Sequence, residues 1–313
     1  MRFKQLILSC VWLMPTVFFI TELNAATGTA PNIPTTLTPN SITLPNPATI
    51  KATNAVNAPK DPNAPNQALA QSLEQQTHGD EVRWLTTNTG PFLSLYTPDK
   101  TGNQFGTVIL LHGNGHHPDW PGVIHLLRTQ LPEVGWSTLS IAVPNYEYQP
   151  PSTVGAPASN AIQNTFSAAT PLIQMLSQRI TQSLSLIPEA NKPIVILAEG
   201  VSVTWLLATY NTLTDARFRG VILVSGQSAI DAPVIDFAQM LQQTPSRFFL
   251  DVTAEQSTIA TQSPQRDVIA RRLRSDRYQL MVMPGALDPS HSPLLLKQMR
   301  GWLRKHFEVA TRP

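Results

Sequence analysis

The run of residues 107–120, TVILLHGNGHHPDW, constrains the fold more than any other part of the sequence. Thr107–Leu111 is short, apolar and partly β-branched, which is typical of a strand buried in a parallel sheet. The strand leads directly into His112-Gly113-Asn114-Gly115, a turn in which glycine permits backbone conformations that other residues avoid. We therefore predict a central strand that ends in a tight loop.

Strand-like and helix-like patterns alternate along the rest of the chain. Glu81–Thr87 and Pro91–Pro98 flank a turn and predict an antiparallel hairpin. Five further strands are predicted after Thr107–Leu111, at residues 136–143, 193–197, 220–224, 247–252 and 278–283. Helical spacing lies between or after them, at residues 121–134, 158–187 (one helix, or two broken near Pro171), 203–210, 233–241, 267–274 and 293–307. This order predicts a three-layer α/β fold, with a mostly parallel sheet after an N-terminal antiparallel hairpin.

The first 25 residues have the features of a secretory signal peptide. Arg2 and Lys4 precede the apolar run Leu6–Ile20, and small residues follow at Ala25 and Ala26. The run is interrupted by a proline and is shorter than the ~20 residues that span a bilayer. We predict export to the periplasm or beyond with no stable membrane span after cleavage, and an uncleaved anchor is the alternative.

Residues 26–77 form a second region, rich in Pro, Thr, Asn and Ala. Eight prolines lie between Ala26 and Gln67, with almost no charge or aromatic residues. Such a composition buries too little apolar surface to offset the entropy of ordering the chain. We predict a disordered linker over residues 26–77 and a folded domain over residues 78–313.

Composition excludes several classes of function. The net charge of +2, from 22 basic and 20 acidic residues, does not favour nucleic acid as a partner. Cys10 is the only cysteine and lies in the predicted signal peptide, so the mature chain is expected to lack disulfides and thiolate metal sites. No cofactor and no oligomeric state is indicated, and the expected partner is a small molecule.

The segment after the strand Pro193–Leu197 is where a nucleophile would stand on a sharp strand-to-helix turn. One register of the G-x-S-x-G pattern overlays residues 198–202 and puts Gly200 at the serine position, which leaves no side chain to attack a carbonyl. A second register makes Ser202 the nucleophile. Strand length favours the first register, and Ser202 is then expected to cap the following helix.

A base and an acid would come from the loops after the last two strands. His291 lies a few residues beyond the last strand and is the candidate base, whereas Asp288 occupies the slot closest to the usual position of a histidine. Glu255, in the loop after residues 247–252, is the candidate acid, with Asp251 as an alternative. Each of these side chains is equally consistent with a structural or surface role.

Histidines cluster in the loop after the first central strand. His112, His116, His117 and Asp119 could ligate zinc, but their spacing matches no common motif, and we predict no metal site. The favoured interpretation makes His112 a structural hydrogen-bonding residue, places His116 and His117 at the mouth of a pocket, and makes Asp119 a cap for the following helix.

Several segments together resemble an uncharacterised bacterial family of exported α/β-hydrolase-like proteins, known only as a domain of unknown function. They are LLHGNGHHPDWPGVIHLLRTQLPEVGWSTLSIAVP, the G-x-x-x-x-W pattern after IVILAEG, and the terminal RGWLRKHF. The resemblance implies the α/β-hydrolase fold. It also implies an oxyanion-type notch lined by Gly113, Asn114, Gly115, His116 and Val201.

Two hypotheses of function follow. In the first, a degenerate α/β-hydrolase-like protein with Gly200 at the nucleophile position binds a small ligand or a partner. In the second, an active serine esterase, lipase or peptidase uses Ser202 and His291 with Glu255 or Asp251. The glycine at position 200 favours binding.

Overall fold

A computed structural model describes residues 64–75, 78–145, 158–228, 233–257, 261–287 and 292–308. The predicted signal peptide, most of the predicted linker, His291 and Asp288 lie outside these residues. Within them, no helix is long and apolar enough to cross a membrane.

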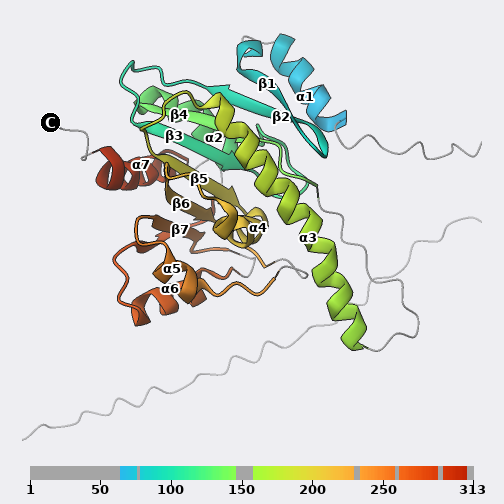
Figure 1. Ribbon diagram of the computed structural model, residues 1–313. Helices are drawn as coiled ribbons and strands as arrows, with labels where there is room; N and C mark the ends of the chain where they lie inside the picture. Colours follow the sequence, from blue (N-terminus) through green and yellow to red (C-terminus); the bar gives the residue numbers. More distant parts are fainter. Residues whose placement is uncertain are drawn as a thin grey trace, which may run out of the picture. The chain divides into compact units, whose positions relative to one another are not determined.

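The core of the domain is one eight-stranded sheet in the order β1-β2-β4-β3-β5-β6-β7-β8 (Figure 1). β1 pairs with β2 and β2 with β4 in antiparallel fashion, and every later pairing is parallel. The predicted fold class is therefore confirmed. The strands are β1 (Val82–Thr87), β2 (Gly90–Thr97), β3 (Gly106–Leu111), β4 (Trp136–Ile141), β5 (Ile194–Glu199), β6 (Phe218–Val224), β7 (Phe248–Ala254) and β8 (Tyr278–Met283).

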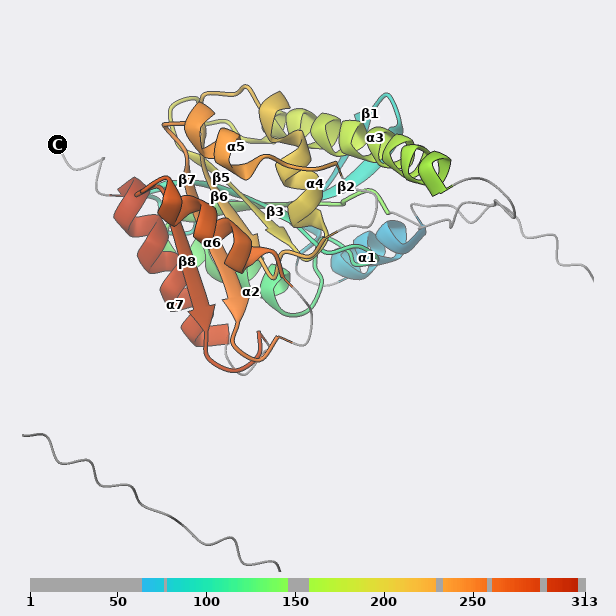
Figure 2. The same cartoon turned by 90° about the horizontal axis from the view of Figure 1, so that it is seen from below.

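Helices cover both faces of this sheet (Figure 2). They are α1 (Ala64–Gln75), α2 (Val123–Gln130), α3 (Ala158–Ser183), α4 (Ser202–Thr209), α5 (Phe237–Gln243), α6 (Ser263–Arg272) and α7 (Ser292–Leu303). α3, α4, α5 and α6 contribute to one apolar cluster, whereas α2 and α7 contribute to the cluster on the other face. α3 is a single helix with Pro171 inside it.

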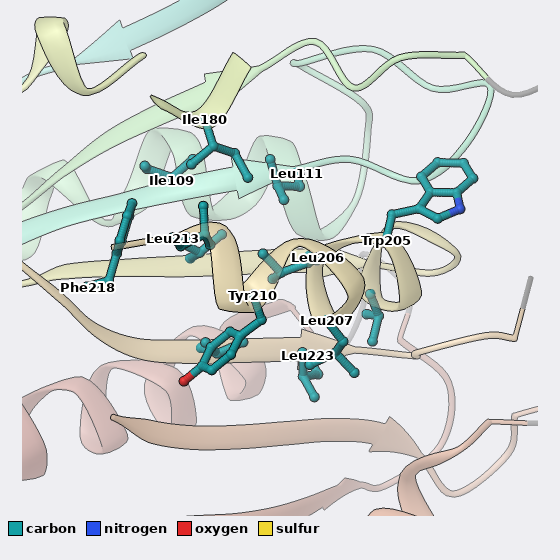
Figure 3. Packing of buried hydrophobic residues seen from close by; sticks show 14 of the residues in the cluster. Ile109, Leu111, Ile180, Trp205, Leu206, Leu207, Tyr210, Leu213, Phe218 and Leu223 are labelled. Carbon is teal, nitrogen blue, oxygen red and sulfur yellow. The ribbon is translucent and has the colours of Figure 1, made fainter. Parts of the chain in front are cut away.

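The helix after the central strand β5 is buried on nearly all sides. Seven of the eight residues of α4 are buried, and Figure 3 shows Leu206 and Tyr210 among side chains of β3, α3 and β6. A helix that is apolar all round is stable only when its surroundings cover it completely. The turn that leads from β5 into α4 is consequently held at the centre of the domain.

One part of the predicted linker folds. Residues 64–75 form α1, whose Ala70 and Leu73 are each 4% exposed and pack with Leu93 and Leu95 of β2. The prediction of a disordered linker is wrong for this stretch, because it was based on the average composition of residues 26–77. A narrow apolar stripe can still form a helix where a strand offers an apolar partner.

Candidate active site

The turn between β5 and α4 is sharp, and Gly200 lies at its apex. Gly200 has φ +62°, a left-handed conformation that disfavours side chains. Its N–H donates to Val224 O at 2.9 Å, and its carbonyl accepts from the N–H of Gln227 at 3.1 Å. Among the described residues, a Cβ built at this position would have one neighbour within 4 Å, Gln227 Nε2 at 3.7 Å. The apex therefore lacks a side chain, and the described part of the chain leaves room for a small one there.

Ser202, the other predicted nucleophile, is completely buried. Its Oγ donates to the carbonyl oxygen of His112 at 2.5 Å, which ties the start of α4 to the end of β3. The predicted capping role is wrong, because Ser202 is the first helical residue and its hydroxyl donates to another segment. Val201 occupies the N-cap position instead, without a side-chain cap.

His112 anchors the loop that follows β3. Its Nδ1–H donates to Gly113 O at 2.8 Å, and its Nε2 accepts from the N–H of Val143 at 2.9 Å. This pairing assigns the proton to Nδ1, and burial lowers the pKa of His112 to about 3, so the ring is neutral. The prediction of a structural histidine is confirmed.

The rest of the loop rests on an aromatic stack. The ring of His116 lies 3.9 Å from that of Trp120 at an angle of 4°, and His117 meets Trp120 edge-on at 5.2 Å. His116 Nδ1 lies 3.0 Å from the position of a Cβ on Gly113, so this glycine allows the ring to lie close to the backbone. Asn114 and Gly115 are exposed, and Gly115 has φ +76°. Four of the five predicted notch residues thus share one loop. The fifth, Val201, lies in the turn before α4, which the hydrogen bond from Ser202 to His112 joins to that loop.

Asp119 does not cap α2, so that prediction is wrong. Its Oδ1 accepts from Arg128 Nε at 2.7 Å and from His125 Nδ1 at 2.8 Å. Gly122 holds the N-cap position of α2. With His112 committed to backbone partners and Asp119 to Arg128, the cluster offers few free ligands. In the described ranges, no group of three His, Cys, Asp or Glu side chains could hold a metal ion.

The two candidate acids differ sharply in their surroundings. Asp251 is completely buried; its Oδ1 accepts from Ser263, and its Oδ2 accepts from Arg266 Nε at 2.6 Å and from the hydroxyl of Tyr278. Those partners satisfy both carboxylate oxygens. Glu255 is exposed in the loop after β7, where its N–H donates to Met283 O. Glu255 is therefore better placed than Asp251 to reach a loop side chain.

Two residues at this edge of the sheet escaped the sequence reasoning. Glu199, the last residue of β5, has a buried Oε2 with no hydrogen-bond partner among the residues that the structure describes, and burial raises the pKa of its carboxyl to about 7. Ser225, the residue after β6, has φ +48°, which is rare for a residue with a side chain. A charged residue at the end of the apolar run IVILAE was the available signal for Glu199. Ser225 has no comparable signal.

Backbone groups and one carboxyl group gather at this end of the sheet. The glycine loop and the turn at Val201 bring backbone groups to the carboxyl ends of β3 and β5, where open α/β sheets bind ligands. A carboxyl group with a pKa near 7 beside the apex can donate or accept a proton at neutral pH. The apex itself offers no nucleophile.

Comparisons with known proteins agree with the fold. The model of a family described as protein of unknown function (DUF3530) matches residues 4–305. Among solved structures, the chain is similar to Est1E from Butyrivibrio proteoclasticus (TM-score 0.51, 10% identity) over 72% of this chain and 98% of that one. It is also similar to the Pyrococcus furiosus esterase Pf2001 (TM-score 0.52, 12% identity) over 72% and 90%. A third similar structure is a monoglyceride lipase from Saccharomyces cerevisiae (TM-score 0.50, 14% identity), over 72% and 95%.

At these identities the structural likeness shows the fold alone, which is that of the α/β-hydrolases. No curated protein matches the sequence.

Proposed function

We propose that this chain, which belongs to the family of proteins of unknown function DUF3530, binds a small ligand at the carboxyl ends of β3 and β5 instead of cleaving it through a serine. The observation that carries the proposal is Gly200, which occupies the left-handed apex of the turn and has no side chain, with only Gln227 Nε2 of the described residues within 4 Å of a Cβ built there. Ser202, two residues on, has its hydroxyl committed to His112. The binding function thus rests on an apex without a nucleophile.

The ligand that fits this edge presents a carbonyl or anionic oxygen to the loop at Gly113–Gly115. Backbone N–H groups in glycine-rich turns favour such oxygens. Below neutral pH the Glu199 carboxyl is protonated and can donate a hydrogen bond to the same ligand. The signal-like N-terminus supports a place of action outside the cytoplasm, and this too is a proposal.

A fluorophosphonate probe, which labels activated serines, tests the proposal. We expect no labelling of the full-length chain, whereas Gly200→Ser is expected to gain labelling because a hydroxyl then stands at the apex. Gly200→Ala is the matched control, because it adds a Cβ in the same strained conformation without a hydroxyl. Intact-mass spectrometry after exposure to the probe measures the outcome.

Labelling of the unmodified chain would contradict the proposal and support an active hydrolase. Loss of that labelling in Ser202→Ala would identify Ser202 as the nucleophile, which the alternative hypothesis combines with His291 as the base and Glu255 or Asp251 as the acid. Loss in Ser225→Ala alone would instead identify the strained serine after β6 as the nucleophile. A Gly200→Ser chain that is folded but unlabelled would contradict the placement of the apex.

A further inference from the structure

A second cavity lies at the opposite edge of the sheet from the site described above. It has a volume of about 450 Å³ and is lined by residues 190–193, 216, 217 and 219, and 306–307. The first two groups lie at the amino ends of β5 and β6, whereas Gly200 follows the carboxyl end of β5. The cavity is therefore separate from the candidate active site. Its size falls within the ~300–1,000 Å³ of typical small-molecule pockets.

An irregular strand turns one arginine into this cavity. Ile194 pairs with Phe218 and Val195 with Gly220, so Arg219 is an extra residue in β6 with no partner on β5. A bulge of this kind redirects a side chain and is common beside functional sites. Arg219 is exposed, and in the described part of the chain its guanidinium makes no hydrogen bond or ion pair. Its five N–H donors are available to a ligand.

An irregular helix forms the facing wall. Arg304–Glu308 is a short π-helical segment that continues α7 and carries His306 and Phe307 into the cavity lining. π-helical turns are rare and frequently mark functional sites. Gly220 permits the close approach, because a Cβ there would lie 2.8 Å from Phe307 Cζ. Two independent departures from regular structure thus converge on the same cavity.

The lining is basic on one side and apolar on the other. Lys192, Arg217 and Arg219 contribute positive charge, and no acidic side chain belongs to the lining. Asp215 neutralises Arg217 from outside the lining, and Lys192 Nζ donates to Gln104 O at 2.6 Å and keeps further donors.

The π-helical segment Arg304–Glu308 supplies the flat aromatic side chains of the cavity. His306 packs 4.3 Å from Phe248 and 5.2 Å from Trp302, and burial lowers its pKa, which favours a neutral ring. Phe307 supplies an apolar surface beside it, and Pro193 lines the cavity at the start of β5.

We propose that this cavity is a second binding site, for a small organic anion that joins a phosphate or carboxylate to a flat apolar group. Arg219 and Lys192 bind the anionic oxygens, because guanidinium and ammonium groups make charge-assisted hydrogen bonds with them. The apolar part of the ligand packs on Phe307 and His306. No part of this site depends on chemistry at Gly200, so its test is independent of the function proposed above.

Isothermal titration calorimetry of the full-length chain with phenyl phosphate tests the site. We expect saturable binding with a Kd below about 1 mM, and binding at least about tenfold weaker in Arg219→Ala. Arg219→Lys keeps the charge and is expected to lose less than Arg219→Ala. Arg272→Ala, which removes an exposed arginine on α6, is the matched control and should bind as the unmodified chain does. Phenol, which lacks the anion, is expected to bind at least about tenfold more weakly than phenyl phosphate.

Three results would overturn the proposal. They are a Kd above about 1 mM for the unmodified chain, equal affinity of the unmodified chain and a folded Arg219→Ala, and equal affinity for phenol and phenyl phosphate. Benzoate in place of phenyl phosphate distinguishes a carboxylate ligand from a phosphate ligand. Far-ultraviolet circular dichroism confirms that each variant is folded.

Discussion

Glu199 illustrates how a single residue can be held in an energetically unfavourable setting at the end of a central strand. Its carboxyl follows five buried residues of β5 and has an oxygen without a partner, and desolvation is the cause of its raised pKa. Burying a polar group without a hydrogen bond costs stability. Such a group is a functional-site candidate when it lies beside other candidate site residues, and Glu199 directly precedes Gly200 in the chain.

The raised pKa predicts how stability depends on pH. The native state holds the Glu199 proton more tightly than the unfolded state, in which the pKa is near 4.5. This contribution to the free energy of unfolding is fully present below pH 4.5 and is lost as pH rises towards 7. Glu199→Gln should remove the loss and stabilise the protein at pH 8 by at most about 3 kcal/mol. Urea unfolding at pH 5 and pH 8 measures it.

The control for this prediction is Glu74→Gln, which changes an exposed carboxyl on α1 in the same way. We expect it to leave the pH dependence of stability as in the unmodified chain. An equal pH dependence of stability in Glu199→Gln and the unmodified chain would show that burial does not disfavour the charged form of Glu199.

At the scale of elements, Arg128 connects α2 to two other segments. Its side chain is 1% exposed; Nη1 donates to the Glu81 carboxylate just before β1, and Nε donates to the Asp119 carboxylate in the loop after β3. Both contacts lie near the loop that carries His116 and His117. The ion pairs therefore hold α2, the first turn of the domain and the histidine loop in one arrangement.

Removal of the Arg128 guanidinium should lower the free energy of unfolding. Arg128→Met leaves the Glu81 and Asp119 carboxylates near a buried site without their cation, and we expect a loss of about 3–5 kcal/mol in the free energy of unfolding. The comparison is Arg271→Met, which removes an exposed arginine from its pair with the half-buried Asp267 on α6 and should cost less than about 0.5 kcal/mol. Guanidinium chloride unfolding measures both. Similar losses for the two variants would refute the special role of Arg128.

At the scale of the whole domain, α1 extends one helical layer to the outer strands. Its apolar side chains pack on Leu93 and Leu95 of β2 together with Ala142, whereas Phe92 belongs to the cluster on the other face. Without α1, this end of the sheet would expose Leu93 and Leu95 to water. A segment of low hydrophobicity thus closes the core.

The packing of α1 can be tested by shortening one buried side chain. Leu73→Ala removes a side chain that is 4% exposed, and we expect a loss of about 2–3 kcal/mol and faster proteolytic cleavage within residues 64–75. Gln71→Ala, on the exposed side of the same helix, should change stability by less than about 0.5 kcal/mol. If Leu73→Ala behaves as Gln71→Ala does, α1 does not contribute to the core.

Short stretches of the sequence are enough to predict the alternation of strands and helices, the antiparallel hairpin, and the glycine that follows β5. Each of these depends on local periodicity or on the conformational freedom of one residue, which short stretches reveal. The position of Ser202 near the turn was equally plain, but the carbonyl that accepts its hydrogen bond lies 90 residues earlier in the chain.

The pairing of buried polar groups, in contrast, becomes visible in the three-dimensional structure. Asp251 and Glu199 are both acidic residues in strands, yet Asp251 meets Ser263, Arg266 and Tyr278 whereas Glu199 Oε2 has no partner. The bulge at Arg219 arises from the pairing of β6 with β5. The apolar surface on which α1 packs is provided by β2. Burial and pairing depend on residues distant in sequence, and no local pattern records those neighbours.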